Sequence, residues 1–183
     1  MHTDTRIIVA QPLTQRGFAP YGEMIGAELI GGEKMTANAV DAPGGTSING
    51  GSAQRSEQWT DLAAHGGAAC MALFRTRGHA APLRLSVFER HCLGSQTFVP
   101  LGQSRCLAVV AGSAEAPDED RIAAFIVEPG QGVTLRRGVW HHPLLTPEAA
   151  DVLVIERNTA TIDCDIVAID GRFIVTVPSE PGP

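Results

Sequence analysis

Short runs of apolar residues, separated by Gly, Pro and Asp, recur along most of the chain. Long patterns with the spacing of an amphipathic helix are scarce, so the pattern predicts β-strands. Because the connections are mostly short and exposed strand edges must be removed, the sequence predicts an all-β barrel or jelly roll. The mouth of such a barrel commonly binds a ligand. The predicted strands are residues 69–75, 83–91, 96–100, 107–111, 123–127, 133–135, 152–157 and 173–177.

The remaining segments are expected to belong to the same domain. The chain has 183 residues, a length that suits one domain with a closed core. Residues 1 to about 51 are rich in Gly, Pro and Ala, with weak strand signals at residues 6–10 and 24–29, and we expect an N-terminal β arm packed on the barrel. We also expect few helices and three minor features. These are a short helix at residues 58–64, an acidic hairpin loop at 112–120 and a loose tail at 178–183.

The predicted strand at residues 83–91 changes from apolar to ionisable along one face. Side chains alternate across a strand, so Leu83, Leu85 and Val87 share a face with Glu89 and His91. A buried charge is costly unless it is paired or bound to a metal, so this polar end indicates the floor of a pocket. The alternative is a solvated strand end, since strands often finish in polar residues.

Composition narrows the class of protein. The net charge of -6, without a basic cluster, argues against nucleic acid as a partner. It leaves a small anionic substrate open, because charges lining a pocket outweigh distant surface charges at physiological salt. The chain has no apolar run long enough to span a membrane and no leader pattern at its start. We therefore expect a cytoplasmic protein without a membrane partner.

The cysteine spacing also favours the cytoplasm. Cys70, Cys92, Cys106 and Cys164 are too scattered for a metal-binding CxxC pair and too few for a disulfide scaffold in a chain of this length. We expect free thiols, as is usual in a reducing compartment.

A second polar cluster follows a Gly-rich turn at residues 130–132 and ends at Trp140, His141 and His142. The two adjacent histidines point to opposite faces of the chain, so at most one of them is expected to join Glu89. Each part also has an ordinary structural interpretation, since a Trp often lies in a core and one His of such a pair is usually structural.

Together the two clusters resemble the two-part signature of the cupin barrels. In that signature, one strand offers His-x-His and then a Glu, and a later Gly-rich turn supplies a last histidine as metal ligand. The resemblance implies a cupin-like double-stranded β-helix, that is, a jelly-roll barrel. Here the first part reads Glu89-x-His91-(x)4-Gln96 and the second reads Gly130-(x)5-Arg136-x-Gly138-(x)2-His141.

Three positions depart from the cupin pattern. Glu89 replaces the first His, Gln96 replaces the usual Glu, and Arg136 replaces a Pro. Two imidazoles, one carboxylate and one amide can still hold a divalent ion of Ni, Mn, Fe or Zn, although the amide binds weakly. The alternative is a site that works without a metal.

At finer grain the chain resembles the ureidoglycolate lyases, a cupin family of purine (allantoin) nitrogen catabolism. The resemblance covers nearly the whole chain. It implies a lyase, typically a homodimer, that cleaves (S)-ureidoglycolate to glyoxylate and urea. The matching strings are Phe18-x-x-Tyr21-Gly22, Ile48-Asn49-x-Gly51-x-x-x-Arg55, Glu89-Arg90-His91-x-Leu93-Gly94-x-Gln96-x-Phe98-x-Pro100, Ala124-Phe125-Ile126, Gln131-Gly132-Val133 and Val139-Trp140-His141-His142-Pro143-Leu144.

This reaction needs a base for the hydroxyl proton, an acid for the departing nitrogen and an anchor for the carboxylate. The resemblance implies that Glu89, His91, Gln96 and His141 form the inner ring, as acid and base or as metal ligands. The candidate substrate-binding residues are Arg75, Arg90, Asn49, Arg55, Trp140 and His142.

Two other functions remain open at this stage. A metal-dependent cupin dioxygenase would also use His and carboxylate ligands, but Gln96 at a ligand position argues against a firm metal set. A non-catalytic cupin that binds a small organic acid would often carry a DNA-binding helical module, and the sequence has none. Oxygen consumption would favour the first, and binding of small acids without turnover would favour the second.

Overall fold

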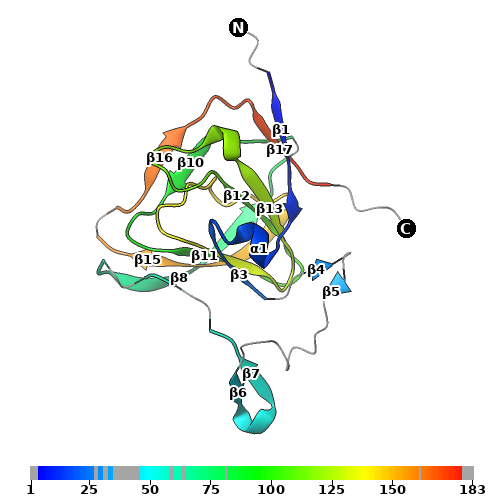
Figure 1. Ribbon diagram of the computed structural model, residues 1–183, viewed down its shortest axis with the longest axis vertical. Helices are drawn as coiled ribbons and strands as arrows, with labels where there is room; N and C mark the ends of the chain where they lie inside the picture. The colour runs from blue at the N-terminus through cyan, green and yellow to red at the C-terminus, as the bar shows by residue number, and fades with distance from the viewer. Residues whose placement is uncertain are drawn as a thin grey trace.

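Five antiparallel strands form the largest sheet, in the order β3-β14-β11-β15-β8 (Figure 1). The computed structural model describes residues 4–26, 29–30, 33–34, 46–57, 60–62, 65–80, 82–160 and 162–178. The five strands are β3 (Gly22–Ile25), β14 (Gly132–Leu135), β11 (Gln96–Pro100), β15 (Ala149–Asn158) and β8 (Ala68–Arg77).

Two further layers lie beside this sheet. In the middle layer β12 pairs with β13, which pairs with β2, and a separate pair, β10 and β16, is joined to β12 through bridges at His141. The outer layer has the order β1-β17-β9. The strands are β12 (Cys106–Val110), β13 (Ala123–Val127), β2 (Gln11–Pro12), β10 (Val87–Arg90), β16 (Asp165–Ala168), β1 (Arg6–Val9), β17 (Phe173–Thr176) and β9 (Leu83–Arg84).

The middle layer is buried on both faces, which explains the continuous apolar runs of β12 and β13. Val110 and Phe125 pack toward Phe98 and Val152 of the five-stranded sheet. On the other face a second core cluster contains Leu107, Val109 and Ile126 of the middle layer together with Leu85, Phe88 and Phe173. Burying a side chain of this size contributes about 1.5–3 kcal/mol, so the two clusters hold the three layers together.

The N-terminal strands β1, β2 and β3 each pair with a strand of the barrel. Helix α1 (Gln15–Phe18) starts at Thr14, whose side chain accepts a hydrogen bond from the Gly17 amide, and it buries Phe18 against Phe125. The hairpin of β6 (Thr46–Ile48) and β7 (Ala53–Arg55) stands out from the barrel in Figure 1. The other short elements are β4 (Leu29–Ile30), β5 (Glu33–Lys34), η1 (Asn49–Gly51) and η2 (Glu119–Arg121).

The all-β prediction is confirmed, and the prediction for residues 83–91 is wrong in one respect. The segment forms two strands, β9 and β10, with a break at Leu85–Ser86. The break changes which side chains face inward, because Leu85 and Phe88, three residues apart, are both buried in one cluster. Glu89 therefore does not continue the row of Leu83 and Leu85.

Other differences are smaller. Strand β16 and helix α1 were not predicted. The predicted helix at residues 58–64 falls partly outside the described residues, and residues 60–62 are not helical. None of the helices in the described ranges has the length and hydropathy needed to cross a bilayer.

Candidate active site

The two polar clusters meet through the main chain. Glu89 and His141 exchange two backbone hydrogen bonds of 2.8 Å, and the Gly138 amide donates to the His91 carbonyl at 2.7 Å. Gly138 has a φ of 78°, a conformation that favours glycine, so the turn before His141 depends on this residue. Segments about fifty residues apart in sequence thus place their ionisable side chains together.

Glu89, His91 and His141 form a compact cluster. One ligand atom from each lies within 4.8 Å of the other two, and the two imidazole ring centres are 5.5 Å apart. His141 is buried, whereas the Glu89 side chain retains 19% of its exposure. The cluster therefore combines a buried imidazole with a carboxylate that solvent still reaches.

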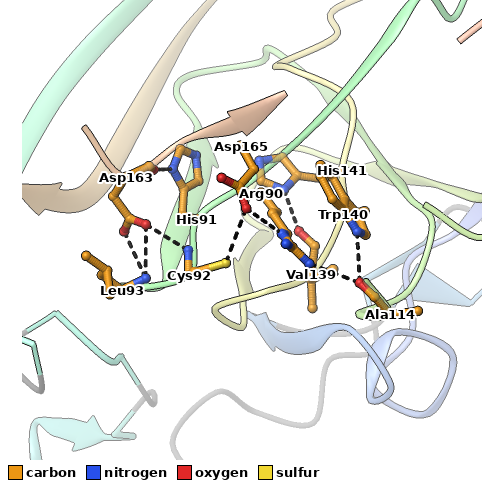
Figure 2. Close-up of polar contacts among 10 residues, drawn as sticks. All are labelled: Arg90, His91, Cys92, Leu93, Ala114, Val139, Trp140, His141, Asp163 and Asp165. Atoms are coloured by element: carbon orange, nitrogen blue, oxygen red, sulfur yellow. Dashed lines mark hydrogen bonds and ion pairs between the residues drawn. The ribbon is translucent and has the colours of Figure 1, made fainter. Parts of the chain in front are cut away.

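Gln96 joins the cluster in a defined orientation. Its amide nitrogen donates to Glu156 at 2.8 Å, so its oxygen faces Nε2 of His141 at 3.0 Å. Nδ1 of His141 faces the carbonyl of Val139 at 2.9 Å, and an imidazole nitrogen must donate to a carbonyl (Figure 2). Nε2 of His141 thus faces oxygen acceptors only, which calls for a hydrogen on Nε2 or a cation beside it.

His91 presents the opposite arrangement. Its Nδ1 donates to the backbone carbonyl of Asp163, which leaves Nε2 as an acceptor in the neutral ring (Figure 2). Nε2 is buried and has no hydrogen-bond partner among the residues that the structure describes. The Asp163 carboxylate holds this segment in place, accepting from the amides of Cys92 at 2.8 Å and Leu93 at 3.0 Å.

Glu89 is held in its ionised form. Burial by itself raises the pKa of this carboxyl, but the hydrogen bond and positive charge of His141, aided by His91, outweigh burial and lower the pKa below its ordinary value. The Cys164 thiol contacts the same carboxylate at 3.8 Å.

These side chains fit a divalent metal. His91 offers an unpartnered buried nitrogen, and both histidines tie Nδ1 to a main-chain carbonyl, as metal-binding histidines generally do. With the Glu89 carboxylate and the Gln96 oxygen they make a set of two nitrogens and two oxygens, which suits Ni, Mn, Fe or Zn.

A cavity of about 160 Å³ lies beside His91. Its lining also includes Ser95, Glu156, Arg157 and Asp163, so His91 is the member of the inner cluster that shares this cavity with charged groups that the sequence did not predict. The Arg157 side chain is only 5% exposed.

The structure does not bring most of the predicted substrate-binding residues to the cluster. Arg90 pairs with Asp165 at 2.9 Å (Figure 2) and stacks on Trp140. Strand alternation places it on the face of β10 opposite Glu89. Arg75 is 76% exposed on β8, where it pairs with Asp151.

The four other candidates also lie elsewhere. Trp140 is buried in the second core cluster, and its indole nitrogen donates to the Ala114 carbonyl at 3.0 Å. Asn49 and Arg55 belong to the protruding β6–β7 hairpin, where Arg55 pairs with Glu57. His142 packs edge-on against Phe88 of the second core cluster. Burial lowers the pKa of His142, despite its hydrogen bond to the Pro143 carbonyl.

Three residues beside the cluster were missed. Glu156 follows the inward-facing Val152 and Val154 at a spacing of two, a signal that the sequence contained. Arg157 faces the other side of the same strand, and Asp163 lies in a loop, where no periodic signal exists.

Comparisons with known proteins bear on the whole chain. A family model described as ureidoglycolate lyase matches residues 5–176. A protein named ureidoglycolate lyase from Pseudomonas syringae pv. syringae (strain B728a) is 37% identical over 163 residues, which are 87% of this chain and 88% of that protein. A protein of the same name from Burkholderia cepacia is 34% identical over 169 residues, 91% of this chain and 88% of that protein.

Among solved structures, RmlC from Streptococcus suis in complex with dTDP-D-xylose shares 11% identity over 50% of this chain and 45% of that chain, with a TM-score of 0.34. The similarity in sequence to the two relatives extends across nearly the whole chain and includes both polar clusters.

Proposed function

Because the chain belongs to the ureidoglycolate lyase family, we propose that it cleaves ureidoglycolate into glyoxylate and urea. The observation that carries the proposal is the meeting of Glu89, His91 and His141 in a chain of this family. The two relatives support a lyase and do not favour a dioxygenase or a non-catalytic binding protein.

The reaction requires two proton transfers, one from a hydroxyl and one to a nitrogen, and both groups are attached to the same carbon. That carbon carries a hydroxyl, a carboxylate and a ureido group. As the hydroxyl proton leaves, its oxygen forms the carbonyl of glyoxylate, the C–N bond breaks, and the ureido nitrogen takes a proton to become urea. General acid and base groups at each end lower the barrier, and no water is consumed.

The hydrogen-bond partners suggest a division of these roles. Nε2 of His91 has no partner and is the acceptor available for the hydroxyl proton. Nε2 of His141 faces only acceptors and is the donor available for the departing nitrogen. The ionised Glu89 balances the charge of His141, and Gln96 keeps that ring in place.

A divalent metal held by Glu89, His91, His141 and Gln96 would polarise the substrate hydroxyl and lower its pKa. In this version the unpartnered Nε2 of His91 would bind the metal instead of accepting the hydroxyl proton. Elemental analysis and chelation distinguish the two versions, since full turnover by metal-free protein favours direct acid–base catalysis by the side chains.

We extend the proposal to a homodimer in the cytoplasm that acts in purine nitrogen catabolism. Free cysteines at all four positions support the reducing compartment. Support for a dimer comes from β8, a ten-residue edge strand that exposes Met71, Leu73 and Phe74.

One assay tests the activity. Purified protein is incubated with racemic ureidoglycolate, and glyoxylate and urea are followed together. We expect equal amounts of both products, with half of the racemate consumed if only the (S) form is cleaved. Ammonia in place of urea, or no glyoxylate, would contradict the proposal.

A further inference from the structure

Two buried polar atoms without hydrogen-bond partners belong to residues that line the same cavity. They are Nε2 of His91 and Nη1 of Arg157. Leaving a charged N–H buried without an acceptor costs more than a typical hydrogen bond contributes, so such a group calls for a partner. A ligand in the 160 Å³ cavity can supply one.

Arg157 is held firmly by groups that leave one end of its fork unused. Nε donates to the Gly66 carbonyl, and Nη2 donates to the His65 carbonyl at 3.0 Å. The nearest carboxylate oxygen to Nη1, in Asp163, is 4.0 Å away, too far for a hydrogen bond. Asp163 therefore forms an ion pair with the guanidinium at this distance, but Nη1 keeps an N–H without a hydrogen-bond acceptor among the described residues.

The acid groups nearby are already engaged. The Asp163 carboxylate accepts hydrogen bonds from two main-chain amides, and Glu156 accepts from Gln96. Another cation near this region, Arg137, pairs with Asp61 at 3.4 Å and contacts His65. Arg157 is therefore the buried cation at the cavity that retains unused donors, in the described part of the chain.

The cavity carries charges of both signs at different points. A carboxylate would bind the Arg157 fork, whereas N–H donors would bind the remaining lone pairs of the Glu156 and Asp163 carboxylates, each of which already accepts from a neighbour. A simple anion would meet repulsion from these two acids. The lining suits a molecule with a carboxylate at one end and amide N–H groups at the other.

We propose that Arg157 is the carboxylate anchor of the substrate and that Glu156 and Asp163 receive its ureido N–H groups. The identity of the acid rests on the proposed function. The arrangement places the ligand beside His91, the residue to which we assign the hydroxyl proton. It replaces the arginines favoured by the sequence, Arg75, Arg90 and Arg55, which have other partners.

The test uses two ligands that cannot be cleaved, because they lack the hydroxyl. Ureidoacetate has the carboxylate and the ureido group of the substrate, and ureidoacetamide has the same shape without the negative charge. Calorimetry gives the Kd of each. We expect wild-type protein to bind the acid about 10-fold to 100-fold more tightly than the amide, as a charged hydrogen-bonding pair predicts.

Three variants test whether the preference for the acid over the amide depends on Arg157. Arg157→Gln should bind the acid and the amide about equally, and Arg157→Lys should keep part of the preference, because a Lys retains the charge and loses the fork. Arg105→Gln, which removes a partly buried arginine paired with Glu148, is the control and should behave like wild type. Circular dichroism verifies folding, and Arg157→Lys decides the question if Arg157→Gln does not fold.

The results separate this inference from the proposed function. An unchanged preference in the Arg157 variants, or wild-type protein that does not prefer the acid, overturns the inference even if ureidoglycolate is cleaved. Conversely, a preference that depends on Arg157 supports the acid anchor even if the wild-type protein releases no urea.

Discussion

At the scale of residues, the cluster is organised by main-chain carbonyls. His91 and His141 each donate from Nδ1 to such a carbonyl, of Asp163 and Val139 respectively, and both rings then present Nε2 to the same space. Carbonyls cannot change protonation state, so they set the tautomer and the direction of each ring without adding charge. The two rings are therefore held in the same way at Nδ1 and differ at Nε2, which in His91 has no partner within the described part of the chain and in His141 faces Gln96.

Replacing Glu89 or His141 by Ala should reduce cleavage about a hundredfold or more, because each removes a group expected to handle protons or charge at the reacting carbon. Steady-state release of glyoxylate measures the effect. Glu148→Gln, at an exposed glutamate, is the matched control and should keep full activity. A folded Glu89 or His141 variant with normal turnover would remove that residue from the mechanism.

His142 should make the fold sensitive to acid. Burial lowers its pKa below 6.5, so the unfolded chain binds more protons than the folded protein once the pH falls below 6.5. Stability is then lost as the pH falls toward the folded pKa, by at most about 1.4 kcal/mol per pH unit from this group. Urea unfolding at pH 7 and pH 5 should show a larger loss in wild-type protein than in His142→Asn. Equal losses would contradict the assignment.

The inner residues of the site could be predicted from sequence, and their surroundings could not. Glu89, His91, Gln96 and His141 stand at spacings that carry a family pattern. Arg90 was a candidate anchor because of its neighbours in sequence, but strand alternation turns it toward Trp140. Arg157 and Asp163 approach the cavity only through tertiary packing, which leaves no local signature.

At the scale of elements, apolar runs predicted where strands lie, but they did not predict where a strand is broken. β11 and β13 have the predicted bounds, since Gln96–Pro100 and Ala123–Val127 are bounded by turn residues. The break at Leu85–Ser86 could not be read from residues 83–91, because each half of the segment has acceptable strand composition. β16 was missed because it is short and, within the described ranges, pairs with β10 alone.

The turn between β10 and β11 depends on a small residue. A Cβ at Gly94 would lie 2.8 Å from Cβ of Arg157 and 3.4 Å from the Asp61 carbonyl, and neither group can simply swing away. Gly94→Ala should cost roughly 1–3 kcal/mol of stability. It should also weaken ureidoacetate binding, because Arg157 must shift.

Gly102→Ala is the control for this variant. Its φ is 64°, so Ala is strained there by about 1–2 kcal/mol, but no atom lies within 4 Å of the added Cβ. Denaturant unfolding and calorimetry should show loss of stability in both variants and loss of affinity in Gly94→Ala alone. Normal affinity in Gly94→Ala would argue against close packing on Arg157.

At the scale of the whole molecule, β8 forms a long edge that exposes apolar side chains. Met71 is 72% exposed and Leu73 47% exposed. If this edge is the dimer surface, Met71→Glu and Leu73→Lys should together convert the dimer to a monomer. Light scattering during size-exclusion chromatography measures the mass. Ile7→Glu, at an apolar residue 66% exposed on β1, should remain a dimer. A dimer that survives the β8 changes would place the contact elsewhere.

The bridges at His141 have a dynamic consequence. His141 is paired with Glu89 on one side and with Val110 on the other, so the candidate acid–base residues belong to the hydrogen-bonded framework between β10 and β12. Local opening cannot release them without separating strands. Amide hydrogen exchange at Glu89 and His141 should therefore occur only through global unfolding, whereas amides of the β6–β7 hairpin should exchange rapidly. The catalytic geometry would then persist at any temperature at which the protein remains folded.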